Sequence, residues 1–284
     1  MKELKKTPVE IFGHDTDSMS ADLELAIRQQ YCRFIHGTCN KPRKSSPQVK
    51  VGICSVASTV ANSKVLEPII VCPQRFKVDS LLETIRQKYL KDWSNVTWIP
   101  EVNIGVGGSI DFVAVEMGKE NKILNFQCVE LQAAGTTGTP YPAVTDFKKH
   151  GKFLKDKYKY SINWANEFLK TMMQQAYKKG RIVKSWKRKI IFVIQDAGMK
   201  YIQKHTDCSL LTSSNVSMPV DFCTFKMKWN GDGRWDLVFE TIYSTSVEGV
   251  NRMIGGAGED LFLTEEEFKE NILKKGLQDK LISE

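Results

Sequence analysis

The sequence predicts an α/β protein in which a mixed central sheet is flanked by helices. Two extended segments, 110–116 and 122–132, are separated by a short polar stretch, which is the pattern of a β-hairpin. A continuous apolar run over 189–195 is typical of a strand buried on both faces. Apolar residues recur at helical spacing over 79–93 and 161–179, which predicts helices that cover the sheet.

The remaining elements follow from capping and turn signals. A short helix is expected over 21–31, with strands over 50–56 and 68–72 after it. In the helix over 161–179, Ser161 is the candidate cap and Gly180 the stop. Further strands are expected over 222–228 and 235–243, joined by a glycine-rich turn. Thr264 and Glu267 form a capping box, which predicts a closing helix to about Lys280.

Length and composition favour one main domain with an appendage. The chain has 284 residues, and we expect an N-terminal region over 1–78 and a main domain over 79–284. The formal net charge of +8 suits a polyanionic partner. The first ten residues are charged and resemble no secretory signal, and no apolar stretch reaches the length of a membrane span, so we expect a soluble, cytoplasmic protein.

The first eighty residues hold a possible metal-binding cluster. Four cysteines occur there, each near turn-forming residues: Cys32, Cys39, Cys54 and Cys72. Tetrahedral sets of sulfur ligands bind zinc or iron. The spacings differ from those of a common zinc finger, so four buried free thiols are the alternative from spacing alone. His36 lies between two of these cysteines and is expected to be a neighbour of the site and not a ligand.

The predicted hairpin carries the candidate catalytic residues. With a two-residue turn at Lys119 and Glu120, Asp111 lies opposite Cys128, and Glu130 and Gln132 point to the same face because side chains alternate along a strand. The diagonal from Asp111 to Glu130 is then roughly 7 to 8 Å between backbones. Two carboxylates at that spacing can share a Mg²⁺ ion. The alternative is that Asp111 caps a turn and Glu130 is a surface acid; their shared face at the ends of apolar strands favours the metal site.

Several motifs in order resemble a known family. They are Gly108-Ser109-Ile110-Asp111-Phe112, Glu130-Leu131-Gln132, Gly37-Thr38-Cys39-Asn40-Lys41-Pro42-Arg43, Gly52-Ile53-Cys54-Ser55-Val56, Cys72-Pro73-Gln74-Arg75-Phe76 and Gly135-Thr136-Thr137-Gly138-Thr139. The first two resemble the PD-(D/E)xK nuclease core in the variant where glutamine replaces lysine. Together the motifs resemble the NotI family of type II restriction endonucleases, over about residues 11–243.

The resemblance implies a role for each motif residue. Asp111, Glu130 and the backbone carbonyl of Leu131 would bind Mg²⁺, and Gln132 would orient the attacking water. Because glutamine carries no charge, the metal would supply more of the activation. Glu101 would be an auxiliary ligand. The four N-terminal cysteines would bind one iron or zinc ion as a structural site, and the resemblance does not tell these two metals apart.

The resemblance also implies the activity. A homodimer would cut double-stranded DNA at a palindromic, GC-rich site and leave 5′-phosphate and 3′-hydroxyl ends, in the cytoplasm of a prokaryote. A cognate DNA methyltransferase, without direct contact, would protect the host genome. The alternatives are a nuclease for repair or transposition and a DNA-binding regulator with a degenerate nuclease core. The sequence indicates neither the recognised bases nor the overhang.

Basic and polar residues supply candidate DNA contacts. Seven of the twelve residues from Lys178 to Lys189 are lysine or arginine, and a second basic group follows Cys39. The turn-rich segment after Gln132 leaves the catalytic strand and can reach the DNA. The candidates are Lys41, Arg43, Lys44, Thr136, Thr137, Lys184, Lys187 and Arg188. The alternative for each is an ordinary solvated surface residue.

Overall fold

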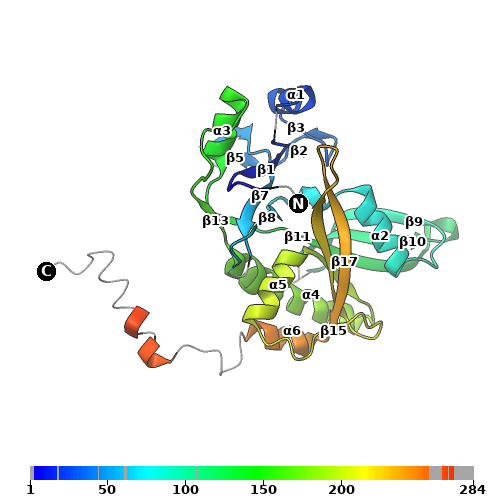
Figure 1. Cartoon of the computed structure of the whole chain (residues 1–284). Coiled ribbons are helices and arrows are strands. Elements are labelled where there is room, and N and C mark those ends of the chain that lie inside the picture. The colour runs from blue at the N-terminus through cyan, green and yellow to red at the C-terminus, as the bar shows by residue number, and fades with distance from the viewer. Residues whose placement is uncertain are drawn as a thin grey trace.

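The computed structural model describes residues 3–17, 19–43, 45–60, 63–105, 108–255, 264–267 and 269–271. Its largest feature is a seven-stranded sheet in the order β15-β17-β16-β14-β11-β10-β9 (Figure 1). The strands are β9 (Val96–Asn103), β10 (Ser109–Met117), β11 (Ile123–Gln132), β14 (Ile190–Gln195), β15 (Thr212–Ser213), β16 (Val220–Trp229) and β17 (Trp235–Thr245). β14 runs parallel to β11 and β16, and the other neighbours are antiparallel. The predicted mixed α/β sheet is confirmed.

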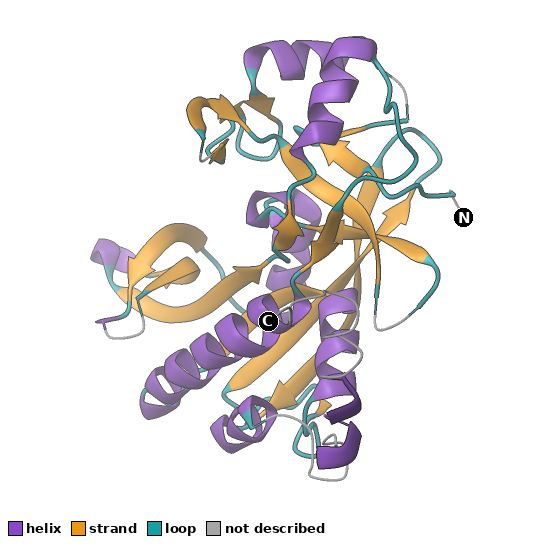
Figure 2. Cartoon of the chain, turned by 90° about the vertical axis from the view of Figure 1, so that its left-hand side faces the viewer, coloured by secondary structure: helices purple, strands orange, loops and turns teal. Residues whose placement is uncertain are grey.

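Helices cover both faces of this sheet because β14 is apolar on both. Ile190, Phe192 and Ile194 pack with α4 (Met173–Ser185) and α5 (Asp196–His205) on one face, whereas Ile191 and Val193 pack with α2 (Asp79–Tyr89) on the other. Figure 2 shows helices lying along the strands of this sheet. α6 (Val247–Ile254) packs against α4. On the face that carries α4, Lys179 of this helix contacts Glu130 of β11.

The long helix predicted over 161–179 differs in the structure. Ser161 lies in the strand β13 (Tyr160–Ile162), so it does not cap a helix. The helix begins with the π-helix η4 (Ala165–Met172) and continues as α4 past Gly180 to Ser185. Gly180 does not end the helix, since it lies where α4 approaches the sheet: an added Cβ would be 2.8 Å from Val220 Cγ2. Packing, and not helix termination, explains this glycine.

A smaller sheet lies beside the large one. Its order is β2-β1-β7-β8, with β1 (Pro8–Ile11), β2 (His14–Asp15), β7 (Ile53–Thr59) and β8 (Leu66–Ile70). Three two-stranded ladders accompany it: β3 (Tyr31–Cys32) with β4 (Gly37–Thr38), β5 (Pro42–Arg43) with β6 (Ser46–Lys50), and β12 (Thr136–Gly138) with β13. α1 (Ala21–Gln29) and α3 (Tyr141–His150) flank this part (Figure 1).

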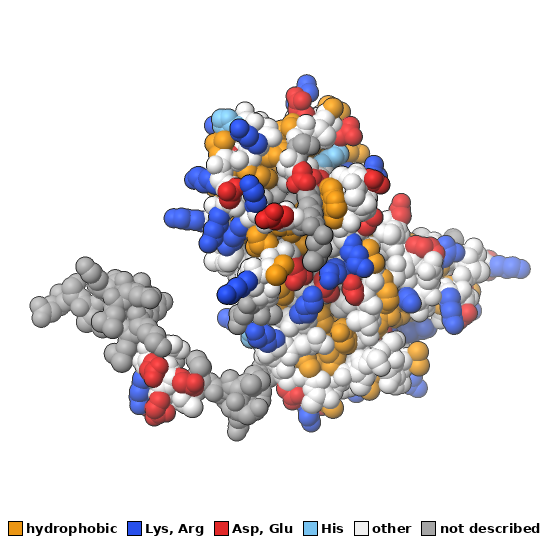
Figure 3. Space-filling view, in the orientation of Figure 1, with side chains coloured by type: hydrophobic (Ala, Val, Ile, Leu, Met, Phe, Trp, Pro, Cys, Tyr) orange, Lys and Arg blue, Asp and Glu red, His pale blue; other side chains and the backbone are white. Residues whose placement is uncertain are grey.

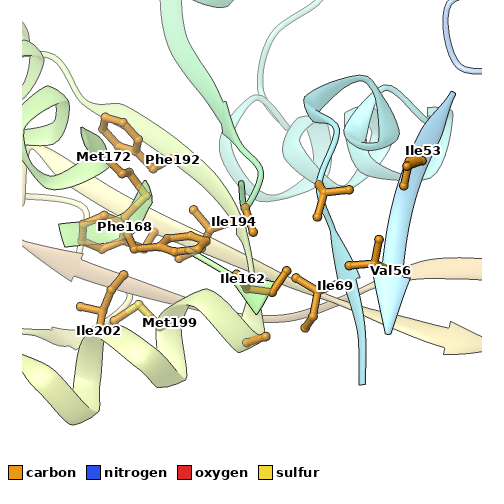
Figure 4. Packing of buried hydrophobic residues seen from close by; sticks show 14 of the residues in the cluster. Ile53, Val56, Ile69, Ile162, Phe168, Met172, Phe192, Ile194, Met199 and Ile202 are labelled. Atoms are coloured by element: carbon orange, nitrogen blue, oxygen red, sulfur yellow. The ribbon is translucent and has the colours of Figure 1, made fainter. Parts of the chain in front are cut away.

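The two sheets share one apolar core. Ile53 and Ile69 of the small sheet lie in the same buried cluster as Phe168 and Ile194 (Figure 4). The side chain of Gln195 also joins them, because its Oε1 accepts from Ile70 N at 2.8 Å and its Nε2 donates to the Pro68 carbonyl. The proposed division near residue 78 stays a prediction.

The segment after β11 crosses to the small sheet. The Tyr160 hydroxyl is within hydrogen-bond distance of the carbonyl oxygens of Thr7 (3.1 Å) and Ala57 (2.9 Å), and Lys6 forms a parallel bridge with Lys157. The chain therefore returns to the N-terminal region between β11 and η4. The loop after Gln132 is consequently held next to residues of the first sixty.

The end of the chain confirms one local prediction. Thr264 Oγ1 accepts from Glu267 N at 3.2 Å, and Glu267 Oε2 accepts from Thr264 N at 2.8 Å, which is the predicted capping box. The rest of the predicted closing helix, from residue 272 to Lys280, lies outside the described residues. In the part of the chain that the structure describes, none of the helices is both long and apolar enough to cross a membrane.

Candidate active site on the β10–β11 hairpin

The predicted hairpin forms with a different register. Phe112 pairs with Val129 and Val113 with Cys128, so Asp111 comes opposite Glu130 and not opposite Cys128. The prediction of a two-residue turn was wrong because the connection is longer: residues Lys119–Asn121 form a 3₁₀ turn in which Glu120 adopts a left-handed conformation (φ 56°). The shift is two residues, and an even shift keeps every side chain on its predicted face.

Asp111 sits where the ladder between β10 and β11 ends. The ladder ends with the pair of Phe112 and Val129, and beyond it Asp111 Oδ2 accepts a hydrogen bond from Leu131 N at 2.8 Å. The side chain thus takes a backbone donor of the neighbouring strand. Asp111 is half-buried, so its carboxylate is fixed at one oxygen while solvent still reaches the residue.

Glu130 is a buried carboxylate beside a buried ammonium group. Its residue is 6% exposed, and its Oε1 lies 2.8 Å from Lys179 Nζ. Burial raises the pKa of Glu130 to about 7, while the Lys179 ion pair acts to lower it and the charge of Asp111 acts to raise it. The backbone N–H of Asp111 also acts to lower the pKa of this carboxylate. Asp111 and Glu130 therefore share one site, and the charge of Asp111 acts on Glu130.

Lys179 was not predicted to belong to this site. The sequence places Lys179 in a basic stretch that is expected to contact DNA from the surface. In the structure its residue is 3% exposed, and its side chain reaches the hairpin from α4. The sequence did hold a signal: Lys179 lies three residues after Ala176 and seven after Met172, which puts it on the apolar face of the helix. A lysine on that face needs a buried partner, and Glu130 is that partner.

The two other predicted catalytic side chains are placed differently. Gln132 is half-buried, and its Nε2 donates to the carbonyl of Ala133 at 2.9 Å, so the amide is turned toward its own backbone. Glu101, on β9, lies opposite Asp111, on β10, since Val102 pairs with Ile110 and Pro100 with Phe112. It is exposed and its backbone is left-handed (φ 53°), which is rare for a residue other than glycine within a strand.

The predicted ligands do not form a complete metal cage. Within the described residues, no three His, Cys, Asp or Glu side chains lie close enough together to hold a metal ion. At the hairpin the structure brings together two carboxylates, Asp111 and Glu130. A Mg²⁺ ion typically uses one or two protein carboxylates and completes its shell with water and substrate phosphate. The chemistry of this pair therefore fits Mg²⁺.

The four N-terminal cysteines lie near one another, but as placed in the described residues they do not form a group that could hold a metal ion. All four are buried: Cys32, Cys39, Cys54 and Cys72. Cys72 and Cys32 act on the charge of Cys54, and Cys39 and Cys32 act on that of Cys72. Cys32 accepts from the backbone N–H groups of Phe34 and Ile35, and Cys72 from that of Gln74. Burial raises the pKa of the Cys54 thiol, which donates to the Gly52 carbonyl at 3.7 Å.

The first predicted group of DNA contacts gathers around the loop after Gln132. The Arg43 guanidinium stacks on the ring of Tyr141, 4.4 Å from its centroid, so the basic stretch after Cys39 lies close to that loop. Thr136 and Thr137 belong to β12, and Thr137 is exposed. Lys41 donates to the carbonyl of Val71 at 2.8 Å. Lys44 lies outside the described residues.

The second group lies at the opposite end of β11. Lys184, Lys187 and Arg188 line a hollow of about 630 Å³ together with Asn125 at the start of that strand. Arg188 donates to Asn125 Oδ1 at 3.1 Å and is half-buried, whereas Lys184 and Lys187 are exposed. Lys189 is instead paired with Asp221 at 2.7 Å. The two groups therefore flank the carboxylate pair from both ends of its strand.

A further basic surface was not predicted. In Figure 3, lysine and arginine side chains gather over α3 and the segment after it. The exposed members are Lys149, Lys152, Lys155, Lys157 and Lys159. Their signal in the sequence is a spacing of two or three residues, with few acids between them. Lys5 forms an exposed ion pair with one of those acids, Asp156, at 2.7 Å.

Comparison with known proteins gives one match. The family model described as restriction endonuclease NotI matches residues 19–232, a range that contains all four cysteines, the hairpin and Lys179. No curated protein and no solved structure matches the chain.

Proposed function

Because this chain belongs to the NotI family of type II restriction endonucleases, we propose that Asp111 and Glu130 mark the site at which it hydrolyses DNA with Mg²⁺. The observation that supports this proposal is the pairing of the two carboxylates on facing strands, joined by the Asp111–Leu131 hydrogen bond. We further propose that the large mixed sheet is a PD-(D/E)xK core, with glutamine in place of lysine at position 132.

In this proposal some of the site residues bind the metal ion, and one orients the attacking water. Mg²⁺, when bound, would lower the pKa of a bound water and offset negative charge on the scissile phosphate. Asp111 and Glu130 would hold it, with the Leu131 carbonyl and the exposed Glu101 as further oxygen ligands. Gln132, half-buried at the end of β11, would turn its amide from the Ala133 carbonyl to orient the attacking water.

DNA would lie along the strand that carries Glu130. Lys184, Lys187 and Arg188 would contact phosphates at one end, and Lys41, Arg43, Lys44, Thr136 and Thr137 at the other. The expected products carry 5′-phosphate and 3′-hydroxyl ends. A homodimer would present two such sites to a palindromic, GC-rich sequence. A cognate methyltransferase would protect the host DNA.

We also propose a structural iron or zinc ion on the four N-terminal cysteines. The proximity of the four side chains and the backbone N–H groups that act to lower the pKa of Cys32 and Cys72 support this proposal. Elemental analysis of the purified protein would test it. About one iron or zinc per chain is expected, and a protein that folds with neither metal would refute this module.

The family membership favours a restriction enzyme over the two alternatives, a repair or transposition nuclease and a DNA-binding regulator. Digestion of a large DNA of known sequence, with Mg²⁺ and with EDTA, separates them. Discrete fragments whose ends map to one palindromic sequence, only with Mg²⁺, are expected. Cutting without sequence preference would point to the other nuclease class, and binding without cutting would point to the regulator.

A further inference from the structure

We propose that Lys179 is a positioning residue of the cleavage site, which holds the Glu130 carboxylate in place from α4. The inference rests on the proposed function of the Asp111–Glu130 pair. Gln132 on β11 carries no positive charge where a lysine is usual, and the inference is that Lys179 on α4 supplies a positive charge to the site instead.

Lys179 connects three elements through its ammonium group. Nζ lies 2.8 Å from Glu130 Oε1 on β11, donates to the Ser109 carbonyl on β10 at 2.8 Å, and donates to Gln175 Oε1 on α4 at 3.3 Å. The contact with Glu130 is an ion pair, and the other two are hydrogen bonds. Ser109 is two residues before Asp111, and Lys179 therefore ties together the two strands that carry the carboxylates.

The contact fixes the orientation of Glu130. One carboxylate oxygen faces Lys179, and the backbone N–H of Asp111 acts to lower the pKa of the same group. A carboxylate has about four sites for partners, so these contacts leave capacity for a cation. With Lys179 in place, the plane of the carboxylate is set before Mg²⁺ and DNA arrive, which removes the cost of ordering this side chain at that moment.

Burial makes a surface role for Lys179 implausible. At 3% exposure it cannot contact a phosphate from solvent, unlike Lys178, which precedes it and is exposed. Buried ion pairs gain little stability over well-packed apolar side chains because both charges must be desolvated. A buried pair that includes a candidate metal ligand is therefore better explained by the site than by the core.

The helix is built to bring Lys179 close to the sheet. Gly180 follows it, and a Cβ there would meet Val220 Cγ2 at 2.8 Å. The absence of that Cβ lets α4 lie close to the parallel strands. The Lys179 side chain then reaches both β10 and β11 with its ammonium group.

The test compares K179M with K170M, a matched change at an exposed lysine of η4. Two quantities are measured: the affinity of the protein for Mg²⁺ alone, by isothermal titration, and the Mg²⁺ concentration that gives half-maximal cutting of a large DNA. Both are expected to weaken by about 10- to 100-fold in K179M, as is common for residues that support metal ligands, and to stay at the wild-type value in K170M. K179R should recover part of the loss because it retains the charge.

The outcomes separate this inference from the function on which it rests. A K179M protein with wild-type Mg²⁺ affinity and wild-type Mg²⁺ dependence of cutting would overturn the role of Lys179. A wild-type protein that never cuts would overturn the proposed function, while the titration would still report on Lys179. If K179M does not fold, K179Q, which keeps a donor for the Ser109 carbonyl without the charge, takes its place with the same two readings.

Discussion

Of two buried ion pairs, one belongs to the proposed active site and the other lies away from it. Glu130 and Lys179 lie at the hairpin, whereas Glu10 and Arg75 join the small sheet to β17. Arg75 Nε lies 2.9 Å from Glu10 Oε2, and the guanidinium also donates to the carbonyl of Trp235. Ser55 Oγ donates to the same glutamate. Since the carboxylate of Glu10 is shared by buried donors, its role is structural.

The Glu10–Arg75 pair predicts a large stability effect. R75M should lower the free energy of unfolding by about 3 to 5 kcal/mol, because it leaves a buried carboxylate without its cation. R28A, in an exposed pair with Glu24, should change it by less than about 1 kcal/mol. Urea unfolding measures both. Equal, small effects of the two substitutions would show that burial does not determine the cost.

Single residues of the site were only partly predictable from the sequence. Strand alternation predicted the common face of Asp111 and Glu130 correctly, because a two-residue shift in register leaves alternation intact. The register itself depended on the left-handed Glu120, a conformation that no glycine at this position announces. Lys179 was predictable from its helical face. The turned amide of Gln132 was not, since it depends on a local hydrogen bond.

At the scale of elements, the approach of α4 to the sheet sets the geometry of the site. The helix continues through Gly180, and the glycine faces Val220 at the start of β16. Lys179 next to it points toward the hairpin. A change that moves the helix away from the sheet would consequently lengthen the contact between Lys179 and Glu130.

G180A tests this packing. The added methyl group would lie 2.8 Å from Val220 Cγ2, so the substitution should destabilise the protein by about 1 to 3 kcal/mol despite the better helix propensity of alanine. Q174A, at an exposed position of the same helix, should change stability by less than about 0.5 kcal/mol. Thermal unfolding of both variants, and of G180A/V220A, is the measurement. A stabilised G180A would contradict the close approach.

Long, strongly patterned elements were the predictable ones. The apolar run that forms β14 and the hairpin strands β10 and β11 lie within two residues of their predicted ends. The π-helix η4 was not predictable, because its hydrogen-bond pattern depends on packing and not on apolar spacing. β9, α3, α5 and α6 were not predicted, since their apolar patterns are shorter or interrupted.

At the scale of the whole molecule, the small sheet and the large sheet meet through polar and apolar contacts. The Gln195 side chain satisfies two backbone groups of β8 from the end of β14. The shared apolar cluster, which contains Ile194 of β14 and Ile69 of β8, also joins the two sheets (Figure 4). The loop after Gln132 crosses the same junction, so the proposed DNA contacts near Arg43 are held at a fixed place relative to Glu130.

Q195A should therefore weaken the junction. It leaves the Ile70 N–H and the Pro68 carbonyl without their partner, which costs about 1 to 3 kcal/mol for a buried group. Q203A, at an exposed position of α5, is the matched control and should be near neutral. Stability is measured by urea unfolding. If the two variants behave alike, Gln195 does not contribute to the joining of the sheets.

The proposed DNA path predicts a change in salt dependence. K184A/K187A should reduce the slope of log affinity against log salt by about 1.8, since each phosphate contact on duplex DNA contributes about 0.9. R28A, on α1, should leave the slope unchanged. Fluorescence anisotropy with a duplex over a range of salt concentrations gives the slope. An unchanged slope in the double variant would exclude this end of β11 from the DNA path.

The most direct test of the central claim is single-turnover cleavage by D111N and E130Q in Mg²⁺, with binding measured in parallel. Both variants should bind DNA with affinity close to that of the wild type and cut it about a thousandfold more slowly, because loss of metal-held charge stabilisation costs several kcal/mol and each 1.4 kcal/mol is a factor of ten. Cutting at the wild-type rate by either variant would show that this carboxylate pair is not the site of hydrolysis.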